Sequence, residues 1–174
     1  EIARLVGAEV IQHEHNRGKG AAVRSGLLQA RERGFAWAIL LDGDAQHAPE
    51  DIPVFLRCAE ESGAVLIIGN RMTDCAAMPL SRKLANRFSS WLISRLARQA
   101  VPDTQCGFRM VRLDAWAARQ LPATGYEVEA EMLLAFAAAE TSLNAATPEA
   151  PRINSIRRGA ENSIELDIKR DKQI

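Results

Sequence analysis

The sequence has few cysteines and no long apolar run. Its three cysteines, Cys58, Cys75 and Cys106, are odd in number and lack the spacing of a metal site, which predicts free thiols in a reducing compartment. The longest apolar stretches, 35–41 and 132–139, are far shorter than the roughly 20 residues that span a bilayer. No signal peptide precedes them. We therefore expect a cytoplasmic protein without a transmembrane helix.

The sequence also lacks an excess of charge of either sign. Lysine plus arginine and aspartate plus glutamate are equal at 22 each, which gives no reason to expect a nucleic-acid partner. No internal repeat or low-complexity tract is present. With 174 residues, 47% of them hydrophobic, the chain has the size and composition of one globular domain, and we expect residues 1–174 to form it. It begins at Glu1 with a helical pattern and no methionine, which suggests the remainder of a longer protein.

Strand and helix patterns alternate along the first part of the chain. Helical periodicity is present in 1–8, in 21–34 and after Pro49, where proline and acidic residues favour a first turn. Strand patterns are present in 8–14, 35–44 and 64–71. This alternation predicts an α/β domain with a largely parallel sheet and helices on both faces.

The pattern changes after residue 71. Residues 79–100 predict an amphipathic, basic helix, 103–116 a glycine turn followed by a strand and a helix, and 126–140 another helix. Residues 148–174 form a polar, weakly periodic tail.

An acidic group follows the apolar run 35–41. Asp42 and Asp44 lie one residue apart, with Gln46 close behind, at the predicted carboxyl end of a strand, where open α/β sheets bind ligands. Carboxylate and amide oxygens suit Mg²⁺ or Mn²⁺, which commonly take substrate phosphates as further ligands. The alternative interpretation is an acidic turn that caps the following helix.

A glycine-rich turn, Asn16 to Gly20, joins a predicted strand to a helix. Its glycines permit close backbone approach to an anion, the helix amino terminus offers N–H groups, and Lys19 adds a positive charge. A plain turn is the alternative, because the turn is neither a P-loop nor a dinucleotide fingerprint.

A third cluster, 103–109, holds a carboxylate, an amide and a guanidinium beside Gly107, which suits an acceptor or a phosphate. A hairpin turn with an exposed salt bridge is the alternative. Arg71 follows a predicted strand in an equivalent position. We expect one of three glutamates to point inward, because they cannot share one helix face: Glu127, Glu129 and Glu131.

The four segments 16–27, 40–53, 67–71 and 103–110 together resemble the family 2 glycosyltransferases of the GT-A fold. The resemblance runs from about Asn16 to Met132 and is strongest to the branch with dolichyl-phosphate and polyprenyl-phosphate sugar transferases. It implies an inverting, metal-dependent transferase that moves a hexose from a nucleoside diphosphate sugar to an acceptor, a polyprenyl or other lipid phosphate. The basic amphipathic helix at 79–100 fits a peripheral contact with the cytoplasmic face of a membrane, its apolar stripe at the interface and its arginines at lipid phosphates. The alternative is a helix that packs on the sheet with solvated arginines.

The resemblance assigns residue roles as well. The nucleotide-binding turn matches Asn16, Gly18, Lys19 and Gly20, and the D-x-D motif matches Asp42 near the nucleoside and Asp44, with Gln46, at the metal and diphosphate. On the catalytic and acceptor side the matches are Arg71 in the crevice, Asp103 as candidate base, and Gln105 and Arg109. In the tail, Arg158 and Ser163 match residues that approach the phosphates.

Two departures from the family pattern are visible. The opening strand with a proline-x-tyrosine-asparagine-glutamate motif has no counterpart, so the first βα unit is expected to be lacking, and carboxyl-terminal membrane helices are absent. Two other functions stay open: a sugar-nucleotide nucleotidyltransferase, or a non-catalytic fragment that binds a nucleotide or a partner.

Overall fold

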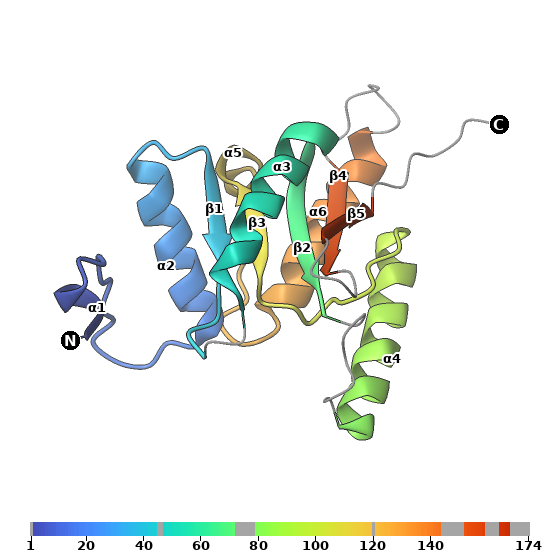
Figure 1. Ribbon diagram of the computed structural model, residues 1–174, viewed down its shortest axis with the longest axis horizontal. Helices are drawn as coiled ribbons and strands as arrows, with labels where there is room; N and C mark the ends of the chain where they lie inside the picture. The colour runs from blue at the N-terminus through green and yellow to red at the C-terminus, as the bar shows by residue number, and fades with distance from the viewer. Residues whose placement is uncertain are drawn as a thin grey trace.

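The computed structural model describes residues 2–44, 47–71, 79–119, 121–143, 152–158 and 164–167. It consists of a five-stranded sheet with helices on both faces (Figure 1). The helices are α1 (Ile2–Leu5), α2 (Lys19–Glu32), η1 (Pro49–Asp51), α3 (Ile52–Ser62), α4 (Leu80–Ala97), α5 (Leu113–Ala117) and α6 (Val128–Leu143). The strands are β1 (Trp37–Leu40), β2 (Ala64–Asn70), β3 (Arg109–Arg112), β4 (Arg152–Arg158) and β5 (Ile164–Asp167). The predicted α/β class is confirmed.

The sheet has the strand order β1-β3-β2-β4-β5 and is mixed. β2 and β4 pair in parallel, whereas β3 lies antiparallel between β1 and β2, and β5 lies antiparallel on β4. β1 and β2, both predicted as strands, therefore run in one direction as expected, and β4 runs with them, but the antiparallel β3 interrupts the expected parallel sheet. The alternation of strands and helices does not reveal this, because strand direction depends on which neighbours pair in three dimensions.

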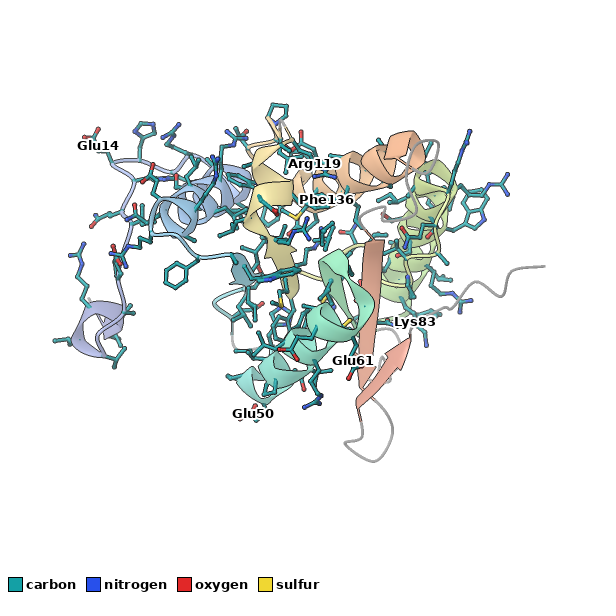
Figure 2. The ribbon with its side chains drawn as sticks, turned by 90° about the horizontal axis from the view of Figure 1, so that it is seen from above. Glu14, Glu50, Glu61, Lys83, Arg119 and Phe136 are labelled. Atoms are coloured by element: carbon teal, nitrogen blue, oxygen red, sulfur yellow. The ribbon has the colours of Figure 1, made fainter. Side chains whose placement is uncertain are left out.

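The core forms around β2, whose first five residues are fully buried. An unbroken apolar run suits this position because the strand is covered on both faces. Helix α3 packs on one face of the sheet and α2 and α6 on the other (Figure 2). Phe55 of α3 and Leu133 and Phe136 of α6 are among the most buried side chains. Gly63 ends α3 in the left-handed conformation that favours glycine, with φ 64°.

Two expectations about strands were wrong. Residues 8–13 form no strand, and Val10 and Ile11 are partly exposed. An alternating pattern is not sufficient for a strand, which needs a neighbour to complete its hydrogen bonds, and no described segment pairs with these residues. Conversely, the tail contains β4 and β5, which the weak periodicity of 148–174 did not predict.

Helix α4 confirms the predicted amphipathic helix, but its faces are reversed. Asn86, Ser90, Ile93 and Ala97 face the protein, whereas six other large apolar side chains of the helix are exposed. We call this exposed set the α4 stripe: Leu80, Leu84, Phe88, Trp91, Leu92 and Leu96. No described helix is both long and apolar enough to cross a membrane.

Candidate active site

The sheet brings three of the predicted segments to one edge. Asp42 follows the end of β1, Arg71 directly follows the end of β2, and 103–107 precedes the start of β3. Because β3 is antiparallel to its two neighbours, its start lies beside their ends. The mixed topology thus assembles these segments at the lower edge of the sheet in Figure 1.

Lys19 joins two carboxylates at this edge. Its Nζ lies 2.7 Å from Asp42 Oδ1 and 2.5 Å from Glu129 Oε1, so it connects the first turns of α2 and α6 to the segment after β1. Burial disfavours the charged ammonium, but the hydrogen bonds and charges of the two carboxylates outweigh it and raise the pKa of Lys19. The three side chains line a cavity of about 70 Å³.

Asp42 is held from several sides. Burial would raise its pKa, but Lys19, assisted by His47, holds that pKa below the ordinary value, so Asp42 is ionised at neutral pH. Its Oδ2 lies 3.7 Å from His47 Nε2. A side chain at Gly107 would overlap the Asp42 carboxylate. Glycine at this position therefore lets the segment before β3 approach Asp42 closely.

Asp103 and Arg71 form a second ion pair. Arg71 donates to the Asp103 carboxylate from Nε at 2.9 Å, from Nη2 at 3.3 Å and from its backbone amide at 3.1 Å. Asn86 Nδ2 and the Gln105 backbone N–H each donate to Asp103 Oδ1 at 3.2 Å. Burial would raise the pKa of Asp103, but Arg71 and Asn86 hold it below the ordinary value. The carboxylate is thus buried, ionised and occupied by donors, which is unfavourable for a general base.

The two other residues of this motif have structural contacts. Arg109 is buried and donates to three backbone carbonyls: Cys106 at 2.8 Å, Thr104 at 2.8 Å and Glu129 at 2.7 Å. Burial lowers its pKa to about 10, so it remains charged at neutral pH. These hydrogen bonds connect residues 104–106 to α6, and none of them is directed to the edge of the sheet where Lys19 and Asp42 lie. Gln105 is exposed, and its Nε2 donates to Ser89 of α4 at 3.0 Å.

The turn before α2 differs from the expected anion-binding turn. Asn16 Oδ1 accepts the Gly18 amide at 2.9 Å, and Gly18 has φ 87°. The amides of Gly20 and Ala21 donate to the Thr124 carbonyl, at 2.7 Å and 3.3 Å. Those two amides are therefore occupied, and the ammonium of Lys19 is the group that this turn directs to the site.

The expected metal ligands are only partly described. Asp44 is exposed at the turn after β1, whereas Gln46 lies outside the described residues. The described residues contain no group of three histidine, cysteine or acidic side chains arranged around a metal position. A Mg²⁺ or Mn²⁺ ion bound by one or two carboxylates and by substrate phosphates would require no such group.

The tail reaches the same edge through β4. Asn70 of β2 pairs with Arg157, so the backbone of Arg158 ends β4 beside Arg71. Ser163 lies outside the described residues.

The sequence did not identify two neighbours of the predicted residues. The sequence predicted that one of three glutamates points inward, without saying which. Glu129 is that residue, because it contacts Lys19. Glu131 accepts a hydrogen bond from the backbone amide of Ala123, and Glu127 accepts one from that of Gly125. Asn86 donates to Asp103, and no motif marks it.

Comparisons with known proteins point to one family. A family model described as glycosyl transferase family 2 matches residues 1–117. The UDP-N-acetylglucosamine–dolichyl-phosphate N-acetylglucosaminyltransferase of Methanococcus voltae is 33% identical over 129 residues, 71% of this chain and 51% of the relative. The undecaprenyl-phosphate mannosyltransferase of Micrococcus luteus is 30% identical over 121 residues, 66% of this chain and 49% of the relative. The chain spans about half the length of these curated relatives.

A solved structure extends the comparison to the fold. Glucosyl-3-phosphoglycerate synthase of Mycobacterium tuberculosis superposes with a TM-score of 0.57 at 18% identity, covering 89% of this chain and 53% of the synthase. At this identity the match supports the GT-A fold alone.

Proposed function

The chain belongs to glycosyl transferase family 2, and on that premise we propose that it moves a hexose from a nucleoside diphosphate sugar to a polyprenyl or other lipid phosphate, with inversion. The observation that carries this proposal is the 33% identity to a relative whose name specifies a dolichyl-phosphate acceptor. We place residues 1–174 in one domain, because β4 of the tail pairs with β2.

Positive groups face the proposed donor side. Lys19 and Arg71 lie at the strand ends where the diphosphate of the donor would bind, and Asp42 is held beside Lys19 for contact with the nucleoside. Asp44, with Gln46, would hold Mg²⁺ or Mn²⁺, consistent with the general use of a divalent metal in this family. When bound, the cation neutralises charge on the departing diphosphate. Lys19 and Arg71 add to that stabilisation, because fixed positive groups act most strongly where charge develops.

The state of Asp103 supports a phosphate acceptor. A hydroxyl acceptor requires a base, whereas a phosphate already carries negative oxygens near neutral pH. Asp103 has a lowered pKa and accepts hydrogen bonds from Arg71, Asn86 and Gln105. We assign it the positioning of Arg71.

The α4 stripe supports a lipid acceptor at a membrane surface. Six exposed apolar side chains follow one helical face, and Lys83, Arg87, Arg95 and Arg98 accompany them. Such a face can lie in a bilayer interface while its basic residues meet anionic headgroups. The Arg95 guanidinium lies 5.8 Å from the Trp91 ring centre, so charge and apolar surface adjoin.

A product assay tests the proposal. We expect incubation with polyprenyl phosphate, Mn²⁺ and a panel of nucleoside diphosphate sugars to yield one polyprenyl phosphate hexose by mass spectrometry, with release of a nucleoside diphosphate. Release of pyrophosphate from a sugar phosphate and a nucleoside triphosphate would identify a nucleotidyltransferase instead. Calorimetric binding of GDP or UDP without any product would identify a non-catalytic nucleotide-binding fragment. Either result would overturn the proposed transfer.

A further inference from the structure

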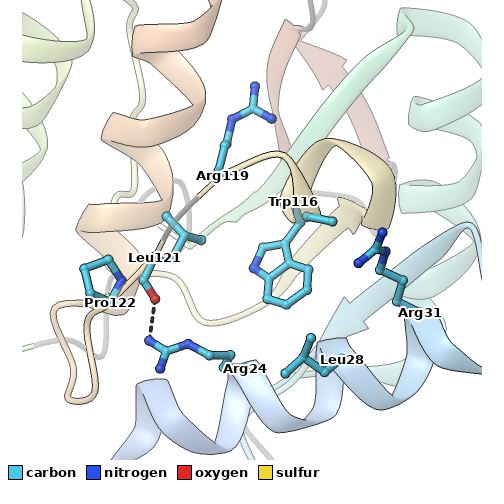
Figure 3. A pocket seen from close by; sticks show the side chains of 8 residues that line it. Arg24, Leu28, Arg31, Trp116, Arg119, Leu121 and Pro122 are labelled. Carbon is cyan, nitrogen blue, oxygen red and sulfur yellow. Dashed lines mark hydrogen bonds between the residues drawn. The ribbon is translucent and has the colours of Figure 1, made fainter.

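A second pocket lies away from the candidate site. It has a volume of about 360 Å³ and lies between α2, α5 and the segment that follows α5. Figure 3 shows Arg24, Leu28 and Arg31 of α2 facing Trp116 of α5. The lining shares no residue with the group around Lys19 and Asp42, so any ligand here would be additional to the donor and the acceptor.

The charge of the pocket is positive and not neutralised by its lining. Three arginines line it, and none of the described lining residues is acidic. Within the described part of the chain, neither Arg24 nor Arg31 forms an ion pair. Asp114 lines a neighbouring hollow that also reaches Arg31, but its Oδ1 accepts from Arg112 Nε at 2.7 Å. The surplus of charge favours an anion.

The three arginines are held differently. The Arg119 guanidinium lies 4.1 Å from the ring centre of Phe136, beside which Figure 2 shows it, and donates to the Ala115 and Ala135 carbonyls. Arg24 donates through Nη2 to the Leu121 and Ala123 carbonyls, which leaves its Nε and Nη1 donors for a ligand. Arg31 is exposed at the end of α2. Figure 3 shows the two guanidinium groups at opposite ends of the pocket, and Arg31 is the one suited to bind an anion.

The remaining lining is apolar. Leu28 is 43% exposed and forms a wall, whereas Trp116 is 7% exposed and forms the floor. Leu121 and Pro122 close the side opposite α2. Apolar walls with a few placed charges are typical of a pocket for an organic ligand rather than an inorganic ion.

We propose that this pocket binds an organic anion, a phosphate monoester or carboxylate that carries an aromatic or alkyl group. The anionic group lies at Arg31, at one end of the pocket, where a guanidinium group offers paired donors. The apolar group lies against Leu28 and Trp116, which Figure 3 shows between the two arginines.

Titration calorimetry with phenyl phosphate tests this site. We expect phenyl phosphate to bind at least ten-fold more tightly than inorganic phosphate or benzyl alcohol, which each supply half of the ligand. Arg31→Gln should weaken binding by about ten-fold, the effect of one charge-assisted hydrogen bond. Arg57→Gln, an exposed arginine on α3, is the matched control and should bind like the unmodified protein.

A third variant separates this pocket from the candidate active site. Lys19→Gln removes the ammonium at the sheet edge and should leave phenyl phosphate binding unchanged. If instead Lys19→Gln weakens binding and Arg31→Gln does not, the anion binds at the sheet edge and the proposal is wrong. Equal affinity for phenyl phosphate and inorganic phosphate would also overturn it.

Discussion

At the scale of the residue, Asp103 has the densest set of contacts at the candidate site. Its carboxylate accepts three hydrogen bonds from Arg71, one from Asn86 and one from Gln105. We expect Asp103→Asn to lower the free energy of unfolding by about 2–4 kcal/mol at pH 7, because it leaves the partly buried Arg71 guanidinium without its counter-charge. Urea unfolding measures this loss.

The hydrogen bonds to Asp103 also determine how the loss of unfolding free energy in Asp103→Asn depends on pH. Because the folded-state pKa of Asp103 is below the ordinary value of 3.8, its stabilisation is fully present above that value and is lost as the pH falls below it. The difference between the unmodified protein and Asp103→Asn should therefore be constant above pH 5 and shrink as the pH falls from 3.8 to 3. Asp114→Asn is the control: Asp114 is exposed and its pair with Arg112 contributes little. A difference that stays constant down to pH 3 would contradict this account.

At the scale of the element, α4 presents its apolar residues outward, so its stripe should bind a surface rather than stabilise the fold. We expect the protein to float with vesicles that contain anionic lipid, and less so at high salt. Replacing Phe88 and Trp91 together by serine should abolish flotation while the melting temperature changes by no more than about 2 °C, since exposed substitutions have small effects.

An exposed aromatic elsewhere provides the control for α4. Phe35, 59% exposed between α2 and β1, lies outside the stripe, and Phe35→Ser should float like the unmodified protein. If the unmodified protein binds neutral and anionic vesicles equally at every salt concentration, the basic residues of α4 have no role. If the double variant still floats, the stripe is not the contact.

Elements with a strong local signal were predictable, and contacts between distant elements were not. Helical periodicity predicted α2, proline and acidic residues after 48 predicted α3, and an apolar run predicted β2, because these are local properties of the sequence. The antiparallel direction of β3 and the strand β4 depend on pairing with segments far along the chain. At the site, the motifs predicted that Asp42, Arg71 and Asp103 lie at strand ends, and the structure places all three at one edge of the sheet. They did not predict that Arg109 would be buried, because its three acceptors are backbone carbonyls that sequence patterns do not mark.

At the scale of the whole molecule, the proposed donor site predicts that metal and nucleotide stabilise the fold together. A ligand that binds only the folded state adds about 2.7 kcal/mol at 100 times its Kd. For a chain of this size that corresponds to a rise in melting temperature of roughly 5–10 °C. We expect UDP or GDP with Mn²⁺ to give this rise in a thermal-shift measurement, and either component alone to give much less, because the diphosphate completes the shell of a cation held by few carboxylates.

Two variants decide whether the edge of the sheet is responsible for that stabilisation. Asp44→Ala should remove the part of the shift that depends on Mn²⁺, and EDTA should do the same to the unmodified protein. Glu50→Ala is the matched control, an exposed carboxylate of η1. Asp44 is the exposed carboxylate of the D-x-D motif, so its removal tests the proposed metal site directly. A shift that survives in Asp44→Ala but is lost in Glu50→Ala would place the cation elsewhere and contradict the proposed donor site.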